Sequence, residues 1–255
     1  MFDEPFAHRA SPVHGLDPRA RLIMAAVFAV AVATLRAPCP ALAGLTVAVI
    51  ALLASNPPWM IALRRLAVVN LFIVFLWLTV PLTMPGEPIL TLGPVGLSRP
   101  GVELAWLVTL KSNAIVIAFL ALVASMDSPT IGHALGRLGL PPKLVFLFLF
   151  TYRYLHVIAD EWQRLRTAAR LRGFVPCTSI HTYRTVGHLL AMVLVNSFDR
   201  SGRVYQAMLL RGFAGRFVSV RRFRSKPRDM VVTLGWIAAL SAVTAMDFFA
   251  EIFRV

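Results

Sequence analysis

The sequence predicts an all-α polytopic membrane protein, with about five transmembrane helices and three cytoplasmic amphipathic helices between the fourth and fifth spans. Of the 255 residues, 58% are apolar and only 15% are charged, whereas ordinary globular domains carry roughly 25% charged residues. Several apolar runs approach the roughly 20 residues that a spanning helix needs. The composition excludes a soluble monomer and a disordered tail.

Five apolar segments account for the predicted spans. They are Leu22–Leu35, Ala41–Ala54, Leu66–Leu82, Leu104–Ala124 and Met230–Phe249. The first two are short and flank the tight turn Ala37-Pro38-Cys39-Pro40, so we expect a helical hairpin whose ends draw in flanking residues. A signal peptide is the alternative for the first segment. The long acidic leader before that segment, and the second apolar run directly after it, disfavour this alternative.

Basic residues near the span ends predict the orientation, because they favour the cytoplasmic side. Arg9, Arg19 and Arg21 precede the first span, and Arg64 and Arg65 lie in the expected loop between spans two and three. Residues 125–229 hold 17 of the 26 basic and 5 of the 12 acidic residues. All lie on one side if four spans precede this block. We therefore expect a cytoplasmic N-terminus and basic block, with the Pro- and Gly-rich loop Pro81–Gly101 outside. The expected parts are residues 1–124 (four spans), 125–229 (coupling helices) and 230–255 (last span).

The cytoplasmic block predicts three helices. The first begins at Asp127-Ser128-Pro129, a capping residue followed by an early proline, and ends near Gly139. The second carries a stripe at alternating spacings of four and three, formed by Leu144, Phe148, Thr151, Leu155, Ile158, Trp162, Leu165 and Ala169. Its first turns, Leu144–Phe150, are apolar all round and are expected in the membrane interface. The third runs from about Thr185 to Arg211.

An internal repeat joins the ends of the two long helices. Residues 160–174 match residues 199–213 at seven of fifteen positions: Asp160/Asp199, Arg164/Arg203, Ala168/Ala207, Leu171/Leu210, Arg172/Arg211, Gly173/Gly212 and Phe174/Phe213. Ordinary helix termination explains Arg-Gly, since glycine adopts the left-handed conformation and arginine favours the negative helix end. An i,i+4 ion pair explains Asp before Arg. Neither explains the repeated Phe or the length of the match. Two equivalent cationic tips fit two equivalent anionic pockets, as a symmetric dimer would offer.

These residues carry a resemblance to the transmembrane T component of energy-coupling factor (ECF) transporters, and more narrowly to the Q-type subunit of cobalt or nickel importers. Two Ala-Arg-Gly signatures at the ends of two long cytoplasmic helices mark that family. Here they read Leu171-Arg172-Gly173 and Leu210-Arg211-Gly212. Leucine replaces the family's alanine in both, while Ala168 and Ala207 keep the setting. The N-terminal residues 11–20 also resemble the metal-type members.

The resemblance implies a non-catalytic scaffold of the bacterial plasma (inner) membrane. It would transmit the motion of two ATPase subunits to a substrate-capturing membrane subunit (the S component), most of all for cobalt(II) uptake. The residues implied in ATPase docking are Ala168, Leu171, Arg172, Gly173, Ala207, Leu210, Arg211 and Gly212. ATP would bind the partner ATPases, no cofactor would bind this chain, and cobalt or nickel would be the transported ion. A nickel or vitamin ECF importer, an ordinary ABC permease and a membrane-embedded enzyme are the alternatives.

Polar residues inside the fourth span form a second candidate site. Lys111 and Asn113 predict either a functional polar site in the membrane or a lysine that snorkels or packs against backbone carbonyls. The six histidines show no metal-ligand spacing, so we expect no metal site on this chain. No glycine-rich phosphate loop is present, and exposed aromatic residues do not interleave the basic block, which argues against nucleic acid. An enzyme would have to use Asp160, Glu161 and Lys111.

Overall fold

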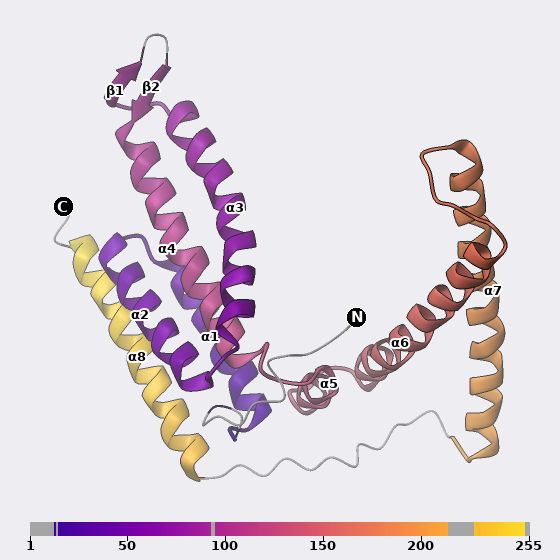
Figure 1. Cartoon of the computed structure of the whole chain (residues 1–255). Coiled ribbons are helices and arrows are strands. Elements are labelled where there is room, and N and C mark those ends of the chain that lie inside the picture. Colours follow the sequence, from indigo (N-terminus) through magenta and orange to yellow (C-terminus); the bar gives the residue numbers. More distant parts are fainter. Residues whose placement is uncertain (1–12, 14, 93–94, 214–226, 253–255) are drawn as a thin grey trace. The chain divides into compact units, whose positions relative to one another are not determined.

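The computed structural model describes residues 13, 15–92, 95–213 and 227–252. Within these residues the chain forms eight helices and one β-hairpin (Figure 1). The elements are α1 (Pro18–Thr34), α2 (Pro38–Ser55), α3 (Trp59–Thr83), β1 (Pro88–Leu92), β2 (Val95–Ser98), α4 (Arg99–Leu122), α5 (Ser128–Arg137), α6 (Pro142–Leu171), α7 (Ile180–Leu210) and α8 (Pro227–Ile252). They belong to two compact units, with the division in α5 between Ala134 and Leu135. The first unit includes α1–α4 and α8, and the second includes α6 and α7.

Helix α4 is the centre of the first unit. Helices α1, α2 and α3 all pack against it, and α8 packs against α1 and α2. Small side chains line the α2 and α4 surfaces: Ala41 and Ala48 on α2, and Ala105 and Ala114 on α4, are all fully buried. Because lipid is as apolar as leucine, membrane helices associate through close packing, which small residues permit.

Helices α1 and α2 follow one another across a short connection, as predicted, but each packs against α4 and α8 and they do not form the predicted packed hairpin. Helix α1 begins at Pro18, behind Asp17, whose carboxylate accepts a hydrogen bond from the Arg19 amide at 3.0 Å. Helix α2 begins at Pro38, so both helices draw in the flanking residues. Phe28 and Val32 of α1 have no exposed surface, which favours α1 as part of the folded bundle over its interpretation as a cleaved leader.

The third span begins earlier than predicted. Helix α3 starts at Trp59, so Arg64 and Arg65 lie within its second turn and not in a loop. The Pro58 carbonyl starts the helix by accepting hydrogen bonds from the amides of Ile61 at 2.9 Å and Ala62 at 3.1 Å. Both arginine side chains are exposed on the helix surface.

The connection Pro81–Gly101 is more ordered than the predicted loop. Helix α3 continues through Pro81 to Thr83, β1 and β2 then pair as an antiparallel hairpin, and α4 begins at Arg99. Gly101 allows α4 to approach α3, because a Cβ atom at this position would lie 2.7 Å from the Pro81 Cα. The Pro- and Gly-rich composition of this segment indicates turns. The pairing of β1 with β2 depends in addition on α3 and α4, which flank the two strands.

Five of the described helices are long and apolar enough to cross a membrane: α2, α3, α4, α6 and α8. The chain is therefore a multi-pass membrane protein. The set differs from the prediction in two helices. Helix α1 has 17 residues and is shorter than the other four predicted spans. Helix α6 is added because it is long and begins with the apolar run Leu144–Phe150.

The second unit is an open pair of antiparallel helices. Glu161 of α6 accepts hydrogen bonds from Asn196 at 2.9 Å and Arg200 at 3.4 Å of α7, whereas Phe146, near the start of α6, lies 6.5 Å from Phe213, just after α7. No side chain of α6 is buried. Helix α7 starts at Ile180, five residues before the predicted start, because the Ser179 hydroxyl caps it.

Candidate docking tips of the two long helices

The end of α6 is a Schellman cap. Gly173 has a positive φ of 85°, and its amide donates to the Arg170 carbonyl at 3.0 Å. The Phe174 amide donates to the Ala169 carbonyl at 3.1 Å. These are the two hydrogen bonds that define the motif, with a left-handed residue just past the helix.

The end of α7 repeats this geometry. Gly212 has a φ of 77°, and its amide donates to the Leu209 carbonyl at 3.0 Å. The Phe213 amide donates to the Met208 carbonyl at 3.1 Å. Two segments that match in sequence therefore end their helices with the same hydrogen bonds.

This geometry changes the interpretation of the repeated phenylalanine. In a Schellman cap the residue after the glycine is commonly apolar and packs back on the helix. The expectation that helix termination leaves the trailing Phe174 and Phe213 unexplained is therefore wrong. The cap still accounts only for the last turn and the two residues that follow it, and not for the identities that extend back to Asp160 and Asp199.

Each tip presents an exposed leucine beside an exposed arginine. Leu171 and Leu210 leave 84% and 90% of their surface exposed. Arg172 and Arg211 are also exposed, and neither forms an ion pair with another described residue. Each tip thus places an exposed apolar side chain beside a charge that has no ion-pair partner among the described residues.

The two tips point in opposite directions, because the helices are antiparallel. Arg172 lies eleven residues beyond Glu161 on α6, and Arg211 lies eleven residues beyond Arg200 on α7. At 1.5 Å per residue, each tip extends about 16 Å from the point where Glu161 meets Arg200. One chain thus carries two equivalent tips, one on either side of this contact.

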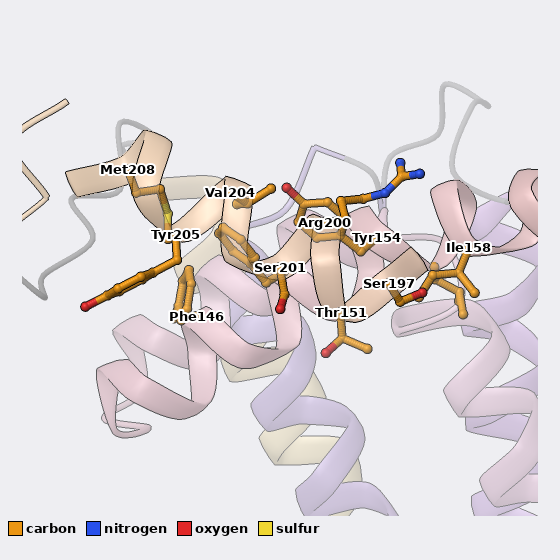
Figure 2. Close-up of a pocket in the computed structure, with 12 residues that line it drawn as sticks. Phe146, Thr151, Tyr154, Ile158, Ser197, Arg200, Ser201, Val204, Tyr205 and Met208 are labelled. Carbon is orange, nitrogen blue, oxygen red and sulfur yellow. The ribbon is translucent and has the colours of Figure 1, made fainter. Parts of the chain in front are cut away.

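An apolar groove lies between α6 and α7, with a volume of about 450 Å³. Figure 2 shows Met208 and Tyr205 at one end and Ile158 and Ser197 at the other. Aromatic rings of α6, including Phe146 and Tyr154, line the groove. The residues that the sequence predicts for docking lie outside the lining of this groove.

The structure gives Lys111 and Asn113 separate partners within the first unit. The Lys111 ammonium group donates to the Ala33 carbonyl of α1 at 3.0 Å. Asn113 and Asn70 exchange two hydrogen bonds, at 3.0 and 3.1 Å, across α3 and α4. Sequence reasoning missed Asn70, although an amide in each of two neighbouring spans is itself a signal for such a pair. Within the described residues, no three His, Cys, Asp or Glu side chains form a metal-binding group.

The described helices thus make a multi-pass membrane protein with two long helices that end in matching cationic tips. The model of the cobalt transport protein family CbiQ matches residues 9–220. The chain therefore belongs to the CbiQ family and is a T component of an ECF transporter.

Individual relatives agree with this family. The chain is 29% identical to the ECF transporter transmembrane protein EcfT of Heliobacterium modesticaldum, over 80% of this chain and 81% of the relative. It is 24% identical to the cobalt transport protein CbiQ of Rhodobacter capsulatus, over 60% and 62% of the two chains. It is also 28% identical to a putative ABC transporter ATP-binding protein of Bifidobacterium longum, over 64% of this chain but only 22% of that longer protein.

Proposed function

We propose that this chain is the non-catalytic scaffold of an ECF-type ABC importer, which transmits the motion of two ATPase subunits to a substrate-capturing membrane subunit. The observation that carries the proposal is the pair of equivalent tips at Arg172 and Arg211, each capped by the same hydrogen bonds and each exposed. The similarity to a relative named as an ATP-binding protein supports an ATPase as the partner.

Arginine suits this docking role physically. Its planar guanidinium group forms two parallel hydrogen bonds to a carboxylate, which lysine does not reproduce. Loss of one partner of a desolvated charge pair at an interface costs several kcal/mol, in the range of about 2–5. The left-handed glycine after each arginine ends the helix there, so the arginine projects from a fixed end. ATP-driven closure of an ATPase pair would then move both tips and tilt the two long helices.

The exposed apolar surface of α7 supports binding of the S component. Leu194 and Phe198 leave 71% and 78% of their surface exposed, and Tyr183 leaves 68%. In this proposal these side chains contact the capturing subunit and the lipid bilayer. The N-terminus and the basic block lie on the cytoplasmic side of the bacterial inner membrane, where the ATPases are.

Cobalt(II) is the proposed substrate, because the family model and two of the relatives carry the name of cobalt transport. In this proposal the capturing subunit holds the metal, ATP binds only the ATPases, and no cofactor binds this chain. A nickel or vitamin importer uses the same scaffold and remains the alternative. A membrane enzyme finds less support, because Lys111 and Asn113 are occupied by Ala33 and Asn70.

A co-purification experiment tests the proposal. The tagged chain is expressed with its neighbouring genes and extracted in mild detergent, and the co-purifying proteins are identified and counted by mass spectrometry. We expect two ATPase copies and a polytopic partner with the native chain, and loss of the ATPase with Arg172→Glu/Arg211→Glu. The single variants are compared as well, because equivalent sequences need not be equivalent in the complex. Recovery of the chain without an ATPase, or wild-type transport by the double variant, would refute the proposal.

A further inference from the structure

Arg21 is a buried arginine near the start of α1, with only 2% of its surface exposed. Its Nη2 atom donates a hydrogen bond to the hydroxyl group of Ser125, which in turn donates to the Ala121 carbonyl at 2.7 Å. Its Nε atom is also buried, but it has no hydrogen-bond partner among the described residues. A guanidinium group carries several N–H donors, so a single neutral hydroxyl satisfies only a small part of it.

No carboxylate neutralises Arg21 within the described part of the chain. The ion pairs found there join other arginines to their acids, and Asp17, one turn before Arg21, faces Arg19 at 3.9 Å instead. An unpaired buried charge destabilises a fold, and an apolar side chain of similar size often serves such a position as well or better. Packing of the first unit therefore does not explain an arginine at this position.

Ser125, the partner of Arg21, lies in the connection that leads to the second unit. Helix α4 ends at Leu122, and Ser125 follows before α5 begins. Ala134 of α5 belongs to the first unit and is fully buried. In the second unit, a Cβ atom at Gly136 of α5 would lie 3.3 Å from the Val145 side chain of α6. Because α5 is packed along its length, a movement of α6 is passed to the connection that holds Ser125.

Asp127 places an unused carboxylate close to this contact. It follows Ser125 by two residues, so the two Cα atoms lie at most about 7 Å apart. Its carbonyl accepts a hydrogen bond from the Ile131 amide at 3.1 Å, whereas its half-buried side chain forms no hydrogen bond or ion pair with a described residue. A carboxylate is a stronger acceptor for a guanidinium group than a hydroxyl is. The better partner for Arg21 thus lies just beyond the one that it binds.

We propose that Arg21 is a switch residue, which binds Ser125 in this state and Asp127 when α5 is displaced during the transport cycle. This inference rests on the proposed function and adds a positioning residue to the scaffold. A displacement of the connection would bring the Asp127 carboxylate to the Nε and Nη2 donors of Arg21, which match two carboxylate oxygens in parallel. The ion pair would stabilise the displaced state, and the close packing of the connection stabilises the present one. Two states with different contacts are what such an element needs.

Arg21→Met separates the switch from a purely structural role. The purified variant should unfold at the native temperature or above it, because the unpaired buried charge is gone. In cells that express the complete importer, the variant should still capture the ATPase, whereas uptake of cobalt(II) should be about tenfold lower. A lower unfolding temperature together with native uptake is the result of a purely structural role and would overturn the inference.

Asp127→Asn tests the second partner with little change of shape. It should lower cobalt(II) uptake as much as Arg21→Met does. The double variant Arg21→Met/Asp127→Asn should lose no more than either single variant, because each change alone already prevents the ion pair. Glu103→Gln is the matched control, since it neutralises an exposed carboxylate of α4, and it should leave uptake unchanged. Losses that multiply in the double variant would show that the two residues act independently.

A chemical crosslink detects the exchange of partners directly and needs no transported substrate. In an Arg21→Lys variant, a membrane-permeant carbodiimide joins the amine at position 21 to the Asp127 carboxylate only where the two groups meet. We expect little product in the isolated chain, and different yields in the complete importer with an ATP analogue and with ADP. Mass spectrometry of the digested chain measures the yields. Equal yields in all three samples would overturn the inference.

The outcomes separate this inference from the function on which it rests. If the native chain captures no ATPase, the scaffold function fails and the switch fails with it. If Arg21→Met and Asp127→Asn both capture the ATPase and take up cobalt(II) at the native rate, the scaffold function stands and only the switch is refuted. Native capture with reduced uptake in both variants, but not in the control, supports the switch.

Discussion

Asn70 of α3 and Asn113 of α4 hold each other by two reciprocal side-chain hydrogen bonds, of 3.0 and 3.1 Å. Each amide also donates to a carbonyl of its own helix, Asn70 to Leu66 and Asn113 to Thr109, both at 2.9 Å. The pair is thus satisfied without any further ligand. Inside a membrane no water is available to replace a lost hydrogen-bond partner. Each amide therefore depends on the other, and the pair holds α3 and α4 together.

The first prediction concerns this pair. Asn113→Leu should destabilise the chain by about 1 kcal/mol, in the range that double-mutant cycles give for hydrogen bonds between membrane helices. Asn70→Leu/Asn113→Leu should cost less than the sum of the two single changes, because no unpaired amide remains. Thermal unfolding in detergent measures all four proteins. Additive losses would show that the two amides are not coupled.

The second prediction concerns the amine in the fourth span. Lys111→Met keeps the side-chain length and removes the hydrogen bond to the Ala33 carbonyl. We expect a stability loss of about 1 kcal/mol, as is typical for one hydrogen bond, and transport of the substrate at the native rate. Uptake into cells that express the complete importer is the measurement. Loss of uptake by a correctly inserted variant would instead make Lys111 part of a functional polar site.

The third prediction concerns the helix caps. Gly173→Ala and Gly212→Ala should each cost about 1–2 kcal/mol, because alanine is strained at positive φ. No neighbouring atom lies within 4 Å of the added Cβ at either position, so conformation alone causes the loss. Gly187→Ala is the control, since that glycine also has open space but lies inside α7, where alanine favours the helix. Thermal unfolding measures the stability of the three variants. Equal unfolding temperatures for all three would contradict the prediction.

The fourth prediction concerns the thiol between α6 and α7. Hydrogen bonds between the Cys177 sulfur and the hydroxyl groups of Ser179 and Thr182 lower the pKa of Cys177 below its ordinary value. A lowered pKa means that more thiolate is present at neutral pH, so alkylation by iodoacetamide should reach half its maximal rate at a lower pH than an ordinary thiol. In a Cys39→Ser background, Thr182→Val should shift this midpoint upward. An unchanged midpoint would show that the Thr182 hydroxyl does not stabilise the thiolate.

The fifth prediction concerns the centre of the helix pair. Glu161→Arg should loosen α6 from α7, because it places two cations side by side and removes the acceptor of Asn196. The exchanged pair Glu161→Arg/Arg200→Glu should restore most of the protection of the α6 and α7 backbone amides against hydrogen exchange. The side chains are 21% and 36% exposed, so the coupling should be modest, about 0.5–1 kcal/mol. Hydrogen exchange of α6 and α7 measures it, and equal exchange in the single and exchanged variants would contradict the pairing.

The bounds of a membrane helix follow from the sequence where the length of an apolar run alone determines them. Helix α4 was predicted at Leu104–Ala124 and lies at Arg99–Leu122. The errors occur where a neighbour decides the backbone. Arg64 and Arg65 were placed in a loop because they are charged, yet Pro58 starts the helix that contains them. The β-hairpin was missed because its strands pair only when α3 and α4 hold their ends together.

By itself, the sequence determined that the chain spans a membrane several times and that two helices end in the same Leu-Arg-Gly-Phe segment. Composition and identity along the chain are local properties, and they need no knowledge of the fold. Only the tertiary structure decided that α6 and α7 are antiparallel, that Glu161 contacts its own repeat equivalent Arg200, and that the leucine of each tip remains exposed. These facts depend on which helix faces meet, and the contacts of Glu161 with Asn196 and Arg200 and of Phe146 with Phe213 settle that choice.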